Sequence, residues 1–83
     1  MNDSAEDLAR LARLRRLLSV GLASAVREDA GVSLREAARV VGVSRQTLAA
    51  WERSDWTPRR ERTAALRYLA LLDRLMSGGR VAA

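Results

Sequence analysis

The sequence predicts an all-α protein, a small helical bundle, and three observations lead to this prediction. Apolar residues recur at helical spacing over most of the 83 residues. Residues that favour helix caps stand where those periodic stretches begin and end. The alternation of apolar and polar residues that marks a strand occurs nowhere in the chain. A chain of this length forms a single domain with a modest core, so we expect one domain over residues 1–83.

The first predicted helix spans residues 4–18. Ser4 and Asp7 stand in the positions of a capping box, and the acidic first turn suits the positive end of the helix dipole. One side of this helix is an apolar stripe, which consists of Leu8, Leu11, Leu14 and Leu18. Because the stripe has no aromatic residue, we interpret it as core or as a surface for another helix rather than as a membrane-surface helix.

A second periodic stretch follows Gly21. A glycine inside a helix costs about 1 kcal/mol relative to alanine, so the first helix weakens at this point. The apolar spacing then restarts with Leu22, Ala25, Val26 and Ala30. The sequence therefore predicts either one kinked helix or two helices in series, ending at Gly31.

Residues 32–53 predict two short helices joined by a tight turn. Ser33 can cap a helix whose third residue is Glu36, which is the capping-box arrangement. Gly42 can end that helix in the left-handed conformation, and Ser44 can cap the next helix. Two helices joined by a short turn with glycine form a helix-turn-helix, whose second helix enters the DNA major groove. A generic helical hairpin has a similar pattern.

The two faces of the second short helix differ. Leu48 and Trp51 lie on one side and would anchor the helix from below, while the small Ala38 lets it cross close to the preceding helix. Glutamine can make paired hydrogen bonds to adenine, arginine can do so to guanine, and small residues let a helix sit deep in the groove. The alternative is an ordinary solvated face. The residues predicted to read bases are Arg45, Gln46, Ala49 and Ala50.

The last predicted helix begins at Thr57 as cap with Pro58 in the first helical position. Its apolar positions form a broad stripe, made by Ala65, Leu66, Leu69, Leu71, Leu72, Leu75 and Met76. The run of Ser and Gly at residues 77–79 is predicted to end it.

The amino-acid composition of the chain favours some classes of protein function and excludes others. The chain carries 15 basic residues, all arginine, against 10 acidic ones, and the net charge of +5 suits a polyanionic partner. It has no Cys and no His, so zinc modules, cysteine nucleophiles and the commonest general base are excluded. We therefore expect no enzyme, no metal, no cofactor and no small-molecule substrate.

The segment that contains the two short helices resembles the Xre/Cro/phage-repressor (lambda repressor-like) class of helix-turn-helix domains. The resemblance covers residues 20–72, within a family core of 20–76. The segment 4–18 is an extension outside that core. The residues that carry the resemblance, in matching order, are Arg27, Gly31, Ser33, Ala38, Gly42, Val43, Ser44, Leu48, Trp51 and Glu52.

The resemblance implies roles for several of these residues. It implies a largely buried ion pair between Arg27 and Glu52, and base reading by the residues that follow the Ser44 cap. The family often has Gln where this chain has Leu34, so Arg35 would take over that phosphate contact, and Ser54 replaces a usual Gly. The residues predicted to contact the DNA backbone are Arg35, Ser44, Thr47, Arg53, Arg59 and Arg60.

We therefore predict a sequence-specific double-stranded DNA-binding protein, a phage or bacterial transcriptional repressor that occupies an operator. MerR or excisionase-like domains share the turn but precede a β-wing, whereas a helix is predicted here after Pro58. A protein-interaction module such as an antitoxin is the other alternative. No segment is long and apolar enough to span a membrane, and the start MNDSAED lacks a signal-peptide pattern. These features predict a cytoplasmic, nucleoid-associated protein.

Assembly is predicted from the two apolar stripes, which exceed what one small core needs. We expect a homodimer, at least on DNA, through the stripe of the first helix or through the late set Leu71, Leu72, Leu75 and Met76. The rival outcome is that the first helix folds back on the last one within a monomer.

Overall fold

The fold, taken from a computed structural model that describes residues 4–53 and 61–81, is all helical, as predicted. Over those residues it has five helices and no strand. The helices are α1 (Ala5–Ser19), α2 (Leu22–Asp29), α3 (Leu34–Val41), α4 (Arg45–Glu52) and α5 (Arg62–Val81). In the described part of the chain, none of these helices combines the length and apolarity needed to cross a membrane.

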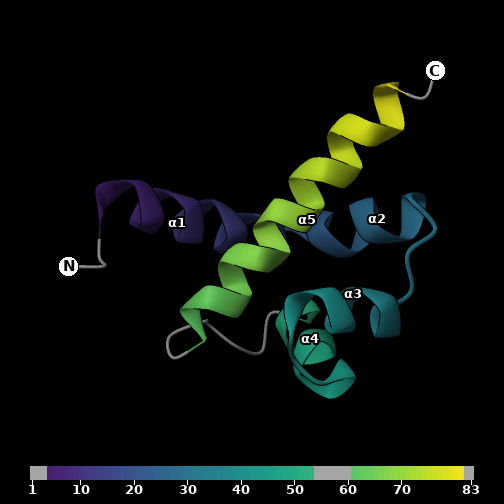
Figure 1. The fold of residues 1–83 in the computed structure, drawn as a ribbon, viewed down its shortest axis with the longest axis horizontal. Coiled ribbons are helices and arrows are strands. Elements are labelled where there is room, and N and C mark those ends of the chain that lie inside the picture. The colour runs from purple at the N-terminus through teal and green to yellow at the C-terminus, as the bar shows by residue number, and fades with distance from the viewer. Residues whose placement is uncertain (1–3, 54–60, 82–83) are drawn as a thin grey trace.

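The long helix α5 organises the bundle. It crosses the molecule and packs against α1, α2 and α3, while α4 packs beneath α3 (Figure 1). The core forms around the inward side of α5, and its largest fully buried side chains come from all parts of the fold except α2. They are Leu14, Val41, Leu48, Trp51, Tyr68 and Leu72.

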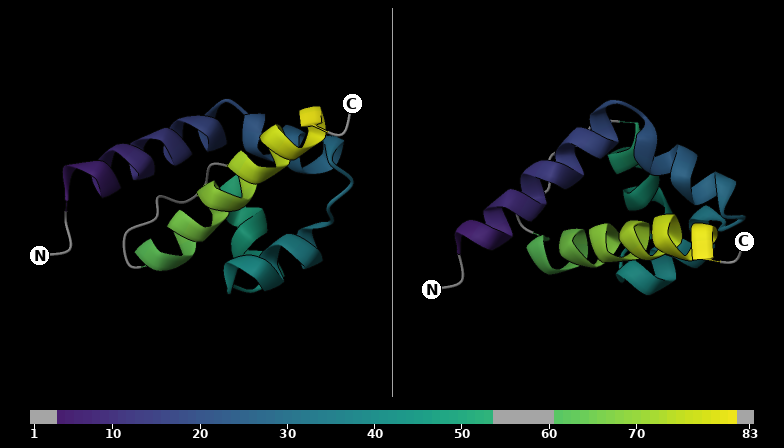
Figure 2. Two further views of the ribbon diagram at one scale, coloured as in Figure 1. Left: turned by 45° about the horizontal axis from the view of Figure 1, so that its top comes forward. Right: turned by 90° about the horizontal axis from the view of Figure 1, so that it is seen from above.

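The chain bends between α1 and α2, so the second of the two predicted arrangements, two helices in series, is the one present. Gly21 adopts a φ of +78°, a left-handed conformation that glycine reaches without a Cβ penalty. The bend is visible at the top of the right-hand view in Figure 2. Beyond the bend, α2 packs against both α1 and α5.

The leucine stripe of α1 is used within the chain. Leu11, Leu14 and Leu18 are buried against the core, whereas Leu8 is 49% exposed. Because α1 packs on α5, these leucines are covered within the monomer, as in the arrangement in which the first helix folds back on the last one. An ion pair joins the same two helices, with Arg13 Nη2 2.8 Å from Asp73 Oδ1. Both of its side chains are half exposed, so this pair adds little to stability.

The predicted end of the last helix was wrong, while its predicted start at Thr57 and Pro58 lies outside the described residues. Within the described residues α5 begins at Arg62, and Glu61 lies just before it, its carbonyl accepting a hydrogen bond from the Ala65 amide. At the other end the helix continues through the Ser-Gly-Gly run to Val81. A glycine costs about 1 kcal/mol in a helix, yet each added residue also adds a hydrogen bond, so glycine weakens an established helix without ending it.

Candidate nucleic-acid interface

The turn between α3 and α4 is built by the residues that the sequence singles out. The Glu36 amide donates to Ser33 Oγ at 3.0 Å, and the Ser33 amide donates to Glu36 Oε1 at 2.9 Å, so the capping box is complete. The hydrogen bond from the Ser33 amide to the Glu36 carboxylate, followed by the Ser33 side chain, holds the pKa of Glu36 below its ordinary value. Ser44 Oγ accepts from the Thr47 amide at 3.0 Å and caps α4. Both helix starts are therefore fixed by local contacts.

Gly42 closes α3 in the way predicted. Its φ is +90°, and its amide donates to the Ala38 carbonyl at 2.8 Å. A Cβ added to this glycine would lie 3.1 Å from Arg67 Nη1, so the tip of one side chain of α5 reaches the turn. The backbone conformation of the turn is therefore what requires glycine at this position.

One face of α4 is anchored in the core. Leu48 and Trp51 are fully buried, and Ala38 on α3 is buried at the crossing of the two helices. The Trp51 ring lies beside the ring of Tyr68 on α5, with centroids 6.3 Å apart and planes inclined at 47°. Because both apolar anchors of α4 are enclosed, the opposite face must point away from the core.

The outer face of α4 carries the residues predicted to read bases. Arg45 and Gln46 are exposed at the start of the helix, and Arg53 is exposed just after its end. Ala49 and Ala50 are half-buried between them. The face is therefore polar at its ends and small in its centre, a shape that can approach another surface closely.

A buried charged network fixes the last residue of α4. The Arg27 guanidinium on α2 donates from Nε to Glu52 Oε2 at 2.8 Å and from Nη2 to Glu52 Oε1 at 2.9 Å. Its Nη1 donates to the Val32 carbonyl at 2.8 Å, in the α2–α3 loop. The side chains of Arg27 and Glu52 are only 7% and 9% exposed, so the expected ion pair is present and largely buried.

Tyr68 is a third member of this network that the sequence analysis missed. Its hydroxyl donates to Glu52 Oε2, and its side chain is fully buried. Burial is the main reason that the pKa of Tyr68 is strongly raised, followed by its hydrogen bond to the Glu52 carboxylate. The sequence did offer one sign of this role, because Tyr68 stands within the apolar stripe of the last predicted helix. A phenol buried in such a stripe needs a hydrogen-bond partner.

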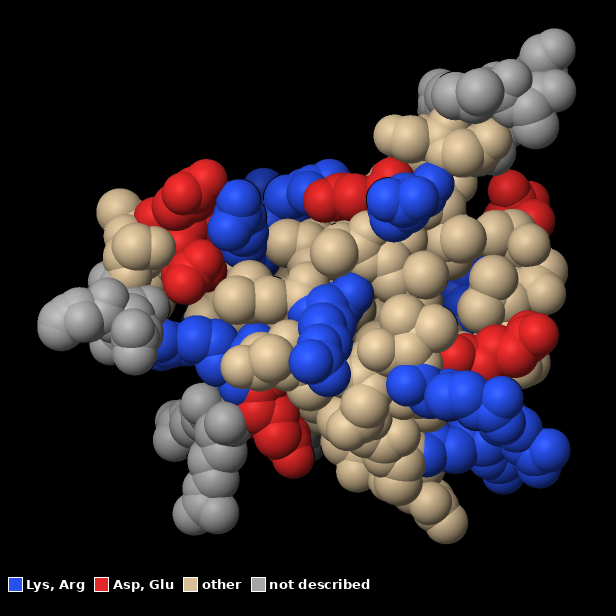
Figure 3. Space-filling view, in the orientation of Figure 1, with Lys and Arg blue, Asp and Glu red and all other residues tan. Residues whose placement is uncertain are grey.

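Basic side chains flank α4 on the α3 side. Arg35 and Arg39 stand one helical turn apart on α3, and both are exposed. Figure 3 shows basic side chains gathered over this helix, at the lower right of the view. Arg35 is one of the predicted backbone contacts, and Arg39 was not predicted. Two further residues predicted to contact the DNA backbone, Arg59 and Arg60, lie outside the described residues.

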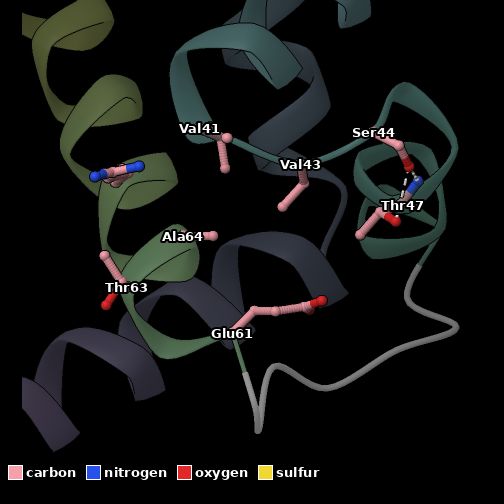
Figure 4. A pocket seen from close by; sticks show the side chains of 9 residues that line it. Val41, Val43, Ser44, Thr47, Glu61, Thr63 and Ala64 are labelled. Atoms are coloured by element: carbon pink, nitrogen blue, oxygen red, sulfur yellow. Dashed lines mark hydrogen bonds between the residues drawn. The ribbon is translucent and has the colours of Figure 1, made fainter.

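A shallow hollow of about 470 Å³ separates the turn from the start of α5. Its wall is apolar where Val41, Val43 and Ala64 face it, and Ser44 and Thr47 border it on the α4 side (Figure 4). Those two hydroxyls are joined by a hydrogen bond of 2.9 Å. Gly42 also lines the hollow, at the turn. On the α5 side the lining residues are Glu61, just before the helix, and Thr63 and Arg67 within it.

The comparisons with known proteins identify the same segment. A family model described as Helix-turn-helix matches residues 24–62. No curated protein and no solved structure matches the chain. The matched residues cover nearly all of α2, all of α3 and α4, and the first residue of α5, whereas α1 lies outside the match.

Proposed function

Residues 24–62 belong to the Xre/lambda repressor-like helix-turn-helix family of DNA-binding regulators, and from this premise we propose that the chain is a sequence-specific double-stranded DNA-binding protein. We further propose that it is a phage or bacterial repressor of the Cro type. It would act by occupying an operator and excluding polymerase. One observation carries the proposal: α4 is capped at Ser44, anchored by two fully buried side chains and turned outward with its polar and small residues.

In this proposal α4 lies in the major groove and reads base edges. Gln46 would form paired hydrogen bonds with adenine, and Arg45 with guanine. Ala49 and Ala50 would let the helix approach closely and would touch thymine methyl groups. The small size of the two alanines supports this role, because a methyl group extends little beyond the helix backbone.

The DNA backbone would be held by residues around the groove-facing helix. Arg35 on α3 is exposed, and Ser44 and Thr47 lie at the amino end of α4, where the helix dipole favours an anion. Arg53, Arg59 and Arg60 complete the proposed set. The excess of 15 basic over 10 acidic residues adds a general attraction to the polyanion.

Two other functions are less well supported by the fold. A MerR or excisionase-like domain needs a β-wing after the helix-turn-helix, and within the described residues the element after α4 is the helix α5. An antitoxin-like module would use the leucine-rich helices to bind a partner. Three of the four leucines of the α1 stripe are instead buried inside the chain.

We also propose that two copies bind a two-fold symmetric operator, with their recognition helices about 34 Å apart. Because α1 packs on α5, the members of the two predicted apolar sets that remain available to a second copy are the exposed Leu8 and the half-buried Leu71, Leu75 and Met76.

Arg35→Ala should weaken binding to all DNA duplexes by a similar factor. A lost phosphate contact should reduce the slope of log affinity against log salt by about one, because fewer counterions are released on binding. Fluorescence anisotropy over a series of salt concentrations measures this slope.

The matched control is Arg74→Ala, which removes the same charge from an exposed position on the half of α5 that extends away from α3 and α4 (Figure 1). Its salt slope should equal that of the unchanged protein. A binding affinity that hardly varies with salt in the unchanged protein would contradict DNA binding and favour a protein partner.

A further inference from the structure

We infer that Tyr68 is a positioning residue for DNA reading, whose hydroxyl sets the orientation of the recognition helix α4 through Glu52. The inference rests on the proposed function and extends it to a residue on α5, beyond the matched segment 24–62. The contact between the Tyr68 hydroxyl and Glu52 Oε2 is the observation from which it starts.

The carboxylate of Glu52 is held from two directions. Arg27 on α2 engages both of its oxygens, and Tyr68 on α5 adds a donor to one of them. Glu52 is the last residue of α4, so these contacts fix the carboxyl end of that helix. A single partner would fix the distance of this end from one helix, whereas two partners on different helices also fix its direction.

The two partners differ in stiffness. The Arg27 guanidinium is enclosed and bonded through Nη1 to the Val32 carbonyl, but its long side chain has several rotatable bonds through which it can adjust to a moving carboxylate. The Tyr68 side chain has two rotatable bonds, is fully buried, and lies beside the Trp51 ring of α4 itself. Because its pKa is strongly raised, its hydroxyl remains protonated and keeps donating across the usual working pH range. Tyr68 is therefore the more rigid of the two side chains that hold Glu52.

The recognition helix depends on such supports. It has only eight residues, and isolated helices of that length are not stable in water. Its proposed base-reading residues lie within two turns of Glu52, so a tilt at the carboxyl end moves them directly. Hydrogen bonds to base edges depend on direction, whereas attraction to phosphates depends mainly on charge. Loss of the Tyr68 hydroxyl should therefore reduce specific binding more than non-specific binding.

The test uses Tyr68→Phe in the full chain, which removes the hydroxyl and keeps the ring. Dissociation constants are measured for a selected duplex and for a shuffled duplex, at one salt concentration and well below the melting temperature of either protein. We expect the constant for the selected duplex to rise about tenfold, which corresponds to about 1.4 kcal/mol. The constant for the shuffled duplex should stay within about twofold, a change of less than about 0.5 kcal/mol.

Two further measurements separate positioning from a general loss of stability. The control Leu72→Val alters a buried residue of the same helix outside the network, and it should leave the ratio of the two constants unchanged. Amide hydrogen exchange should accelerate in α4 of Tyr68→Phe more than in α3. An unchanged ratio of constants together with an unchanged α4 exchange rate would overturn the inference.

The proposed function can fail separately. If the unchanged protein binds the two duplexes equally, sequence-specific DNA binding is wrong. The exchange measurement then decides alone whether Tyr68 orients α4. Faster exchange confined to α4 supports the positioning role, and uniform exchange across α3 and α4 contradicts it.

Discussion

Glu52→Ala should lower the free energy of unfolding by about 3–5 kcal/mol, because it leaves the Arg27 guanidinium buried without its counter-ion. Arg27 is 6% exposed, so water cannot replace the lost carboxylate without opening the packing between α2 and α4. The Tyr68 hydroxyl loses its acceptor in the same step. Small domains have total stabilities of about 5–15 kcal/mol, so this single change should bring the chain close to unfolding. Urea denaturation followed by circular dichroism measures the difference.

Two variants test whether burial of the charge is the cause. Glu28→Ala removes a carboxylate that lies 3.5 Å from Arg27 but is 69% exposed, and its effect should stay within about 0.5 kcal/mol. The double variant Arg27→Met with Glu52→Leu removes both charges, and it should recover much of the lost stability. A Glu52→Ala protein within about 1 kcal/mol of the unchanged chain would show that the ion pair does not hold α4 in place.

Leu14→Ala should lower the free energy of unfolding by about 2–5 kcal/mol, the usual cost of removing a fully buried leucine. Leu14 lies on α1 and is completely enclosed where that helix packs on α5. If α1 is part of the same folding unit as the helix-turn-helix, the unfolding of α4 must shift by the same amount. Trp51 fluorescence reports on α4 in a Trp56→Phe background, and circular dichroism reports on all helices.

The control for this prediction is Leu8→Ala, one to two turns earlier on α1. Leu8 is 49% exposed, so its loss should cost well under 1 kcal/mol. A Trp51 transition that does not move in Leu14→Ala, while the helix signal does, would show that α1 folds separately from the helix-turn-helix.

The parts of the fold that the sequence predicts well are those fixed by contacts between near neighbours. The capping box at Ser33 and Glu36, the left-handed Gly42 and the cap at Ser44 each involve residues at most four positions apart. Their chemistry can be recognised without knowing the rest of the structure. The buried side of α4 was also predictable, since helical spacing alone places Leu48 and Trp51 together.

The parts that the sequence predicts poorly depend on contacts between distant segments. Spacing shows that the α1 leucines form a stripe, but it leaves open whether a second copy or α5 covers them. The end of α5 could not be read from the glycines near it, because a local preference of about 1 kcal/mol is easily outweighed. The Tyr68 hydroxyl meets Glu52 across 16 positions of sequence. A tyrosine in an apolar stripe indicates that its hydroxyl needs a partner, but the local pattern does not identify that partner.

Selection of binding sites from a random duplex pool tests whether the outer face of α4 reads DNA sequence. The unchanged protein should enrich one site with defined base preferences, and a symmetric site would have half-sites about one helical turn apart. Selection with Gln46→Ala should lose the preference at one base pair of each half-site. Affinity for the original site should fall by about 1–3 kcal/mol. An identical selected site with Gln46→Ala, or no enrichment with the unchanged protein, would contradict the claim.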